Sequence, residues 1–298
     1  MDVALATSSD LIGLDPDDAP LVEALSREGL SIAPVAWDDP HFDWSSAGIC
    51  LIRSTWDYHL RLPEFLAWVE RADSLTRLWN PPATVRWNGR KTYLRELASA
   101  GIPVVETVWL APGDADDLSR IAGDRGWSEI VVKPVVSAGA RDTLHVRRDD
   151  LEEGRRHLAA LLRRGEAMVQ PYLDSVEGYG ERCVVWIDGQ ITHSVRKRPI
   201  LRRSGDDWVE ADSAQLDPEE STLATRAIAA SGRDALYARV DLVRDGEGRS
   251  RVLELEMIEP TLFFVHCRPA AARLASAVSR EALRRRASSR PSGGRLPP

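Results

Sequence analysis

The sequence has little cysteine and no long apolar run. Cys50, Cys183 and Cys267 lie far apart, each beside apolar neighbours. This spacing argues against a disulfide framework or a zinc site and indicates reduced, buried thiols. No apolar stretch reaches the roughly 20 residues that a transmembrane helix needs. The first ten residues also lack the basic flank and apolar core of a secretory signal. We therefore expect a cytoplasmic protein that makes no membrane contact.

Excess positive charge is absent as well. The net charge of −7 argues against non-specific nucleic-acid binding, because phosphate backbones are bound by basic surfaces. Tryptophan, in contrast, is plentiful, with ten residues. Most of them are expected to pack in cores, and only Trp56 is assigned a substrate role, because of its position. A chain of 298 residues with 43% apolar residues favours two or three compact lobes.

The amino-terminal region alternates strands and helices, which predicts a small parallel α/β lobe ending near the stiff Asn80-Pro81-Pro82 joint. Ligands of such sheets lie beyond the carboxyl ends of the strands, where Arg53 is expected. Its guanidinium could hold an anionic small molecule, and the alternative is a structural arginine paired with Asp38 or Asp57. The expected strands are 2–6, 31–36 and 48–52, and the expected helices are 17–28 and 62–72.

Residues 237–257 predict an antiparallel hairpin whose charged residues alternate with apolar ones. Period-two geometry places Arg239 and Asp241 on one face of the first strand, and Glu254 and Glu256 on one face of the second. If these faces coincide, three carboxylates meet and require a cation, for which Mg²⁺ is the hard-oxygen choice. A hairpin with solvated charges fits the same alternation. The apolar block at 262–264 favours burial.

The segment between these two regions contains basic residues at the ends of predicted strands. Lys133 ends a buried strand and precedes a small-residue loop whose amides could approach phosphate, although the loop also fits a plain turn and matches no known phosphate fingerprint. Three cations at 196–198 follow a hairpin strand and indicate a solvated edge unless they face the acidic hairpin. The expected helices are 91–99, 151–164, 218–231 and 269–286, and the expected strands are 104–110, 130–134, 167–173, 182–187 and 190–195.

An ordered set of residues runs along the chain: Lys91, Lys133, the run 170–173, Asp241 and the run 254–256. In this set the chain resembles the ATP-grasp superfamily, in the branch of glutathione synthetases and RimK-like ligases. The resemblance covers roughly residues 86–275. It implies an α/β protein with α+β lobes, in which two lobes clamp ATP. The implied parts are an amino-terminal α/β lobe at 1–85, a central lobe at 86–165, a carboxy-terminal lobe with the metal site at 166–284, and a disordered tail at 285–298.

The same resemblance implies roles for individual residues. The sequence departs from the family pattern at two places: Glu256 stands where glutathione synthetase has asparagine, and the small-residue loop lacks the usual glycines. The residues implied to bind ATP are Lys91, Lys133, Ser137, Gly139, the backbone at Gln170, Tyr172 and Leu173, and Glu181 for the ribose, with Glu177 as its rival. The implied metal ligands are Asp241, Glu254 and Glu256, which would hold two Mg²⁺ ions or Mn²⁺. The implied catalytic arginines are Arg198 and Arg239.

Residues 53–58 and 135–143 resemble, more narrowly, a subgroup of cyclo-ligases that close O-ureido-D-serine to the antibiotic D-cycloserine. This implies that a small amino-acid carboxylate is activated as an acyl phosphate and then captured by a nitrogen of the same molecule. Arg53, Tyr58 and Arg239 would bind the substrate. The alternatives are an intermolecular carboxylate-amine ligase of the peptide type and a nucleotide-binding protein without turnover. A homodimer is compatible with each of these functions.

Overall fold

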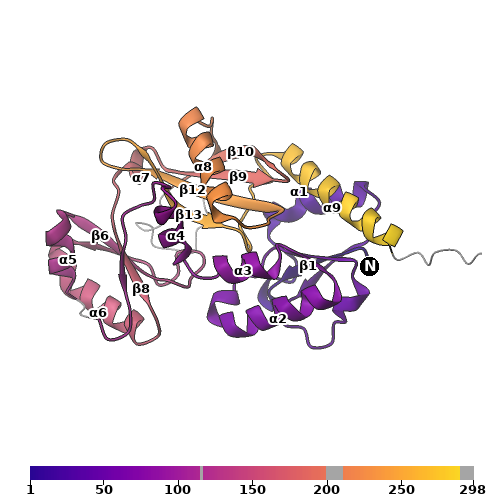
Figure 1. Cartoon of the computed structure of the whole chain (residues 1–298), viewed down its shortest axis with the longest axis horizontal. Helices are drawn as coiled ribbons and strands as arrows, with labels where there is room; N and C mark the ends of the chain where they lie inside the picture. The colour runs from indigo at the N-terminus through magenta and orange to yellow at the C-terminus, as the bar shows by residue number, and fades with distance from the viewer. Residues whose placement is uncertain (115–116, 199–210, 289–298) are drawn as a thin grey trace, which may run out of the picture.

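The computed structural model describes residues 1–114, 117–198 and 211–288, which form three β-sheets with helices packed on them (Figure 1). The first sheet is parallel, with strand order β2-β1-β3-β4, and confirms the predicted amino-terminal α/β lobe. Its last strand was not predicted, because three residues are too few to show a period-two pattern. The strands are β1 (Val3–Thr7), β2 (Ile32–Ala36), β3 (Ile49–Ile52) and β4 (Arg77–Trp79).

The second sheet is antiparallel, with strand order β5-β8-β6-β7, and α5 and α6 pack against it. The predicted strand 104–110 is wrong over its first half. Only Val108–Leu110 pairs within this sheet, because Val104 forms a bridge to Val252 of another sheet. The elements are β5 (Val108–Leu110), α5 (Leu118–Arg125), β6 (Glu129–Pro134), β7 (Leu144–Arg147), α6 (Leu151–Leu162) and β8 (Ala167–Pro171).

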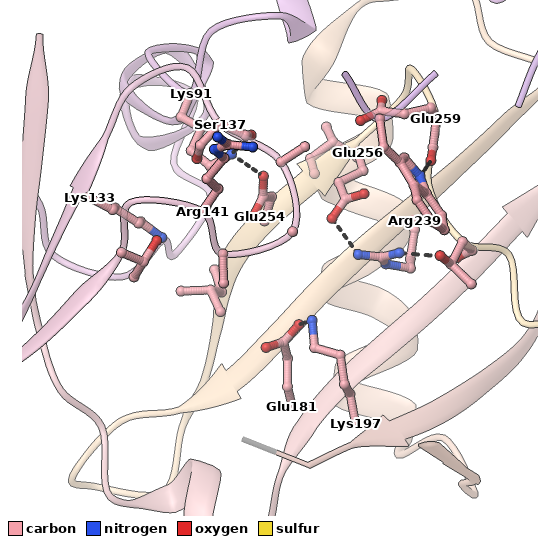
Figure 2. Close-up of a pocket in the computed structure, with 18 of the residues that line it drawn as sticks. Lys91, Lys133, Ser137, Arg141, Glu181, Lys197, Arg239, Glu254, Glu256 and Glu259 are labelled. Atoms are coloured by element: carbon pink, nitrogen blue, oxygen red, sulfur yellow. Dashed lines mark hydrogen bonds and ion pairs between the residues drawn. The ribbon is translucent and has the colours of Figure 1, made fainter. Parts of the chain in front are cut away.

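The third sheet is antiparallel, with strand order β11-β10-β9-β12-β13, and carries many of the side chains drawn in Figure 2. It contains the predicted hairpin as β12 and β13. The predicted two-residue turn is also present, with Asp188 and Gly189 both at positive φ. The elements are α7 (Ser175–Gly178), β9 (Glu181–Ile187), β10 (Gln190–Lys197), β11 (Ala211–Ser213), α8 (Pro218–Ser231), β12 (Tyr237–Arg244) and β13 (Ser250–Glu256).

The outer edge of β13 is covered by side chains from the two short helices α3 (Pro82–Asn88) and α4 (Tyr93–Ser99). The Asn88 amide donates to the Leu255 carbonyl (2.7 Å) and accepts from the Met257 amide (2.6 Å), as a neighbouring strand would. The Tyr93 hydroxyl accepts from the Leu255 amide (3.0 Å). These contacts satisfy the exposed ladder groups and hold Glu254 and Glu256 in place.

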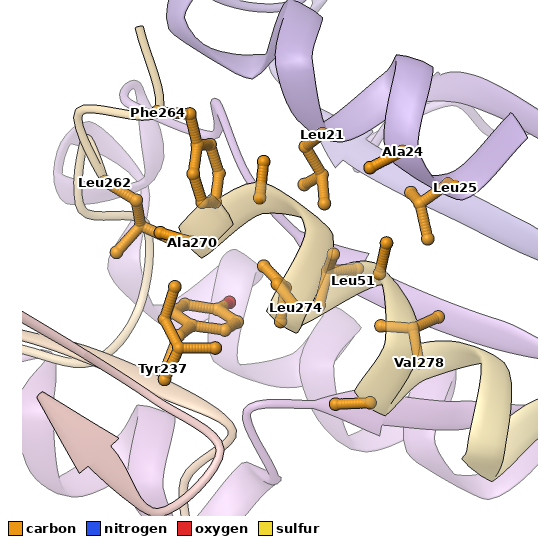
Figure 3. Packing of buried hydrophobic residues seen from close by; sticks show 14 of the residues in the cluster. Leu21, Ala24, Leu25, Leu51, Tyr237, Leu262, Phe264, Ala270, Leu274 and Val278 are labelled. Carbon is orange, nitrogen blue, oxygen red and sulfur yellow. The ribbon is translucent and has the colours of Figure 1, made fainter. Parts of the chain in front are cut away.

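The two ends of the chain share one apolar core. Helix α9 (Arg268–Ser288) and α1 (Ala19–Arg27) cover the same face of the first sheet, and α2 (Leu62–Leu75) covers the other. Figure 3 shows Leu274 and Val278 of α9 beside Leu21 and Leu25 of α1. The helix continues to Ser288, so the predicted tail 285–298 begins too early. Its remaining positions, 289–298, lie outside the described residues.

Across the described ranges, no helix combines the length and apolar character needed to cross a membrane.

Candidate active site

A cavity of about 960 Å³ lies where the three sheets meet, large enough for a nucleotide and a small second molecule. The amino-terminal lobe contributes Trp56 and Tyr58, the second sheet contributes Lys133 and Gln170, and the third contributes its acidic hairpin. The position fits the sheet topologies, because strand ends and loops from all three lobes converge there. Figure 2 shows charged side chains lining this space from opposite walls.

The hairpin acids share one face, as predicted. Strand pairing sets Asp241 opposite Glu254 and Arg239 opposite Glu256, and cross-strand partners project to the same side. The Arg239 guanidinium binds Asp241 through two hydrogen bonds, Nε to Oδ1 at 2.7 Å and Nη2 to Oδ2 at 2.8 Å. It also pairs with Glu256 and donates to the Thr261 carbonyl at 3.1 Å. The predicted Arg239 therefore lies inside the acidic cluster.

The electrostatics of this cluster are unbalanced. Burial alone would raise the pKa of Asp241, but Arg239 and Lys197 outweigh burial and hold it below its usual range. For Glu256, burial and then the neighbouring Asp241 and Glu254 raise the pKa to about 7, although Arg239 opposes them. Arg239 is shared between Asp241 and Glu256, so further positive charge near Glu256 would stabilise its ionised form.

Two lysines face the same acids from the opposite wall. Lys91 Nζ lies 2.6 Å from Glu254 Oε1 and donates to the Ser137 carbonyl at 2.9 Å. Lys133 is buried, and burial followed by repulsion from Lys91 lowers its pKa to about 8, with Glu254 opposing this shift. Both predicted lysines thus line the cavity, on the side where the phosphates of a nucleotide were expected.

Lys197 is a site residue that the sequence patterns did not single out. It pairs with Glu181 and lies 3.8 Å from Asp241, whereas the neighbouring Arg198 is exposed and lies 3.5 Å from Asp212. The basic run therefore turns one cation inward and a neighbouring one outward. Strand alternation would have separated Lys197 from both adjacent arginines. Arg198 is not among the cavity-lining residues, and its implied catalytic role stays a prediction.

Oxygen donors suited to a metal ion occur at two places in this cluster. The predicted set is Asp241, Glu254 and Glu256, on facing strands. A second group, Glu181, Cys183 and Asp241, has ligand atoms within 4.8 Å of one another. Hard carboxylate oxygens fit Mg²⁺ or Mn²⁺, and both groups share Asp241. Arg239 bonds each oxygen of Asp241 once, and because a carboxylate offers about four lone-pair sites, Asp241 keeps sites for a metal ion.

The predicted adenine segment lines another part of the cavity with Gln170, Tyr172 and Leu173. The Tyr172 ring stacks on His145, with 4.0 Å between centroids, and its hydroxyl bonds Glu177. Glu181, by contrast, lies in the acidic cluster beside Asp241. The two rival ribose acids thus occupy different places: Glu177 beside the adenine segment but off the lining, and Glu181 on the lining.

The small-residue loop closes one side of the cavity. Ser137 and Gly139 both line it, and Gly139 and Ala140 have φ angles of 60° and 58°. This left-handed backbone costs glycine little, which explains why glycine occurs at 139. Arg141, the last residue of the loop that the resemblance implied, also lines the cavity. The loop therefore reaches the cavity although it lacks the usual run of glycines.

At the other end of the cavity, the amino-terminal lobe contributes Trp56, Tyr58 and His59. Arg53 differs from the prediction: it is buried, donates to Asp18 at 2.9 Å and to the Pro260 carbonyl at 3.1 Å, and is not among the lining residues. It is thus a structural arginine, paired with Asp18 in place of Asp38 or Asp57. No pattern in the sequence pointed to Asp18, because the contact joins segments far apart in the chain.

Three lobes around one cleft, with lysines facing an acidic hairpin, define the class of the molecule as an ATP-grasp ligase. Comparison with known proteins identifies the family within this class to which the chain belongs. The family model for the N-terminal domain of D-cycloserine synthetase DcsG matches residues 3–80. The cycloserine biosynthesis protein DcsG of Streptomyces lavendulae is 35% identical over 292 residues, covering 93% of this chain and 97% of that protein. The chain belongs to the D-cycloserine synthetase family.

Solved structures agree with this assignment. The crystal structure of D-cycloserine synthetase DcsG superposes with a TM-score of 0.88 at 33% identity, covering 95% of this chain and all of that one. D-alanine–D-alanine ligase from Bacillus anthracis shares the fold, with a TM-score of 0.70 at 14% identity over 97% of this chain and all of the other. The chain is therefore an enzyme of the carboxylate-amine ligase type, a class that uses ATP with a divalent metal ion.

Proposed function

We propose that this enzyme closes O-ureido-D-serine to D-cycloserine, with ATP as the energy source and Mg²⁺ as the preferred metal ion. The observation that carries the proposal is the 35% identity to DcsG along nearly the whole of both chains. The cavity supports it, because one connected space joins the lysine and carboxylate region to an end lined by the amino-terminal lobe.

The placement of ATP follows from the charges. Adenine would lie along Gln170, Tyr172 and Leu173, where backbone and ring atoms are available. The phosphates would extend toward Lys91 and Lys133, whose positive charge offsets theirs. Glu181 remains our choice for the ribose hydroxyls, and Glu177 remains its rival.

The metal would be held by Asp241, Glu254 and Glu256, and when bound it would offset negative charge on the β- and γ-phosphates. The residues of the chain would do the positioning. Lys91 is already fixed between Glu254 and the Ser137 carbonyl, so its ammonium group needs little reordering to reach a phosphate. Such fixed charges supply much of the rate in phosphoryl transfer.

The chemistry would proceed in two stages. The substrate carboxylate attacks the γ-phosphorus, forming an acyl phosphate and releasing ADP. The oxyamine nitrogen of the same molecule then attacks the acyl carbon, a C–N bond forms, the nitrogen loses its proton and inorganic phosphate leaves. Water cleaves the bond between this nitrogen and the carbamoyl carbon, and the carbamate released breaks down to CO₂ and ammonia. Arg239, which lines the cavity, would steady the acyl phosphate, and Tyr58 would contact the rest of the substrate. The loop at 137–141 would exclude water from the acyl phosphate.

A direct assay tests the proposal. The enzyme is incubated with Mg-ATP and O-ureido-D-serine alone, and ADP and D-cycloserine are measured. Equal release of ADP, phosphate and D-cycloserine is expected. An intermolecular ligase would leave ADP at background until a second amine is added, and a nucleotide-binding protein without turnover would release none under either condition. Replacing Mg²⁺ by Mn²⁺ in the same assay tests the metal preference.

A further inference from the structure

Glu259 has a position in the cavity that the proposed reaction does not use. It follows β13 in the connection 257–267, which runs from the acidic hairpin to α9. The residue is 8% exposed and lines the cavity. Figure 2 shows Glu259 on the side of the pocket away from Lys133, next to Glu256 and Arg239. It therefore lies at the substrate end, rather than between the phosphate-side lysines.

The carboxylate of Glu259 has no cation bound to it among the described residues. Its hydrogen bond is to its own backbone amide, and Lys91 acts on it through charge alone, without an ion pair. Each neighbouring acid, in contrast, forms an ion pair with a basic side chain. Glu254 pairs with Lys91, Glu256 and Asp241 pair with Arg239, and Glu181 pairs with Lys197.

An isolated buried carboxylate is costly. Burial, followed by repulsion from Glu256, raises the pKa of Glu259 to about 8. The backbone carbonyl of Glu259 accepts from the Trp56 indole at 3.3 Å, a contact that leaves the carboxyl group unpaired. Buried acids of this kind are normally paired, so the missing partner is expected to arrive with a ligand.

We propose that Glu259 binds the ammonium group of the amino-acid substrate and so selects α-amino acids over their desamino analogues. The inference rests on the proposed function for the presence of such a substrate in this half of the cavity. An ammonium group supplies both the charge and the hydrogen-bond donors that Glu259 lacks. The α-carboxylate of the same substrate would then extend toward Arg239 and the ATP phosphates, where it has to react to be activated.

Asp17 is the strongest competitor for this role. It is buried and lines the cavity, and its Oδ2 has no hydrogen-bond partner within the described part of the chain. Its Oδ1, however, already accepts from the Val265 amide at 3.0 Å. Oδ2 is also sealed from solvent, so Asp17 offers less to a ligand than Glu259 does.

The test compares O-ureido-D-serine with its desamino analogue, 3-(ureidooxy)propanoic acid. Binding is measured by calorimetry with Mg-ADP present, and ADP release is measured with Mg-ATP. For Glu259→Gln we expect the Kd and KM of O-ureido-D-serine to rise by about 30-fold or more, as for truncation of one member of a buried ion pair. Binding of the desamino analogue and the KM of ATP should change by less than about 3-fold, because neither depends on an ammonium contact.

Two further variants distinguish an ammonium contact at Glu259 from a contact at Asp17 and from a purely structural effect. Glu64→Gln, on the 67% exposed side chain of α2, should behave as the unchanged enzyme. A selective loss in Asp17→Asn instead of Glu259→Gln would transfer the role to Asp17 and overturn the proposal. If Glu259→Gln weakens the binding of both compounds equally, the role of Glu259 is structural, and if the variant needs more Mg²⁺, its role is in metal binding. Either result would also overturn the proposal.

The binding measurement also distinguishes the two proposals. If the enzyme binds O-ureido-D-serine through Glu259 without releasing ADP, the ring-closure function fails and the ammonium contact stands. If ADP is released but Glu259→Gln leaves the preference for the amino compound intact, the contact fails and the function stands. If the unchanged enzyme binds the two compounds equally well, selection by an ammonium group is excluded.

Discussion

The two ends of the cavity differ in how their charges are neutralised. At the phosphate end, lysine and arginine side chains already pair with carboxylates, as Lys91 does with Glu254 and Arg239 with Asp241. At the substrate end, Glu259 is buried without a bound cation from the described ranges, and Arg53 is withdrawn to Asp18. Paired charges keep a site assembled before its ligand arrives. A buried carboxyl group without a partner instead indicates the chemistry of the ligand group that would pair with it.

The largest effect expected from this comparison is at the phosphate end. Replacing Glu254 by Gln removes the carboxylate that holds Lys91 and should lower kcat/KM by roughly 1000-fold, as loss of a preorganised electrostatic group does. ADP release by the purified variant measures it. Glu247→Gln, at a 70% exposed position in the turn of the same hairpin, is the control and should keep full activity. An unchanged rate in Glu254→Gln would remove the metal and phosphate role of this end.

The second-largest effect is expected at Asn88, whose side chain bonds the backbone next to Glu254 and Glu256. Asn88→Ala leaves the Leu255 carbonyl and the Met257 amide without their partner, so the free energy of unfolding should fall by about 2 to 4 kcal/mol. Denaturant unfolding measures this change, with Thr225→Ala on the exposed side of α8 as the control. A loss no larger than that of the control would show that water replaces the Asn88 contacts.

The pH dependence of ATP use should also separate the two ends. Lys133 is cationic only below its lowered pKa of about 8, so its attraction for phosphate is lost as the pH rises through that value. We expect kcat/KM for ATP to fall above about pH 8 by up to tenfold per pH unit. Lys133→Arg keeps the charge at every pH and should flatten this decline. A decline of the same steepness in the variant would assign it to another group.

The smallest effect is expected where the substrate end meets solvent. Trp56 is 37% exposed and its indole bonds the Glu259 carbonyl, so Trp56→Phe loses one partly solvated hydrogen bond. The KM for the amino-acid substrate should rise about 2- to 5-fold, with the KM for ATP unchanged. Steady-state kinetics with each substrate varied in turn measure both constants. An equal rise in both would mean that Trp56 supports the whole cleft, and the two ends would then not be independent.

Several parts of this site were accessible from the sequence because they depend on local patterns. Alternation along the hairpin predicted that Asp241, Glu254 and Glu256 share a face, and the strand ending at Pro134 placed Lys133 near the cavity. Lys197 was missed although the same alternation applies to it, because three adjacent cations resemble a solvated edge. Glu259 follows its strand in an irregular segment, where no periodicity predicts the direction of a side chain.

The sequence by itself determined the order of the elements, the shared face of the acidic hairpin and the family, because each follows from periodicity or from motifs that are local in the chain. Only the tertiary structure decided that Arg53 pairs with Asp18, that α9 closes the core of the first lobe, and that no cation of the described residues binds Glu259. Each of these depends on which distant segments meet, and the choice among partners is made by burial and charge in the folded molecule.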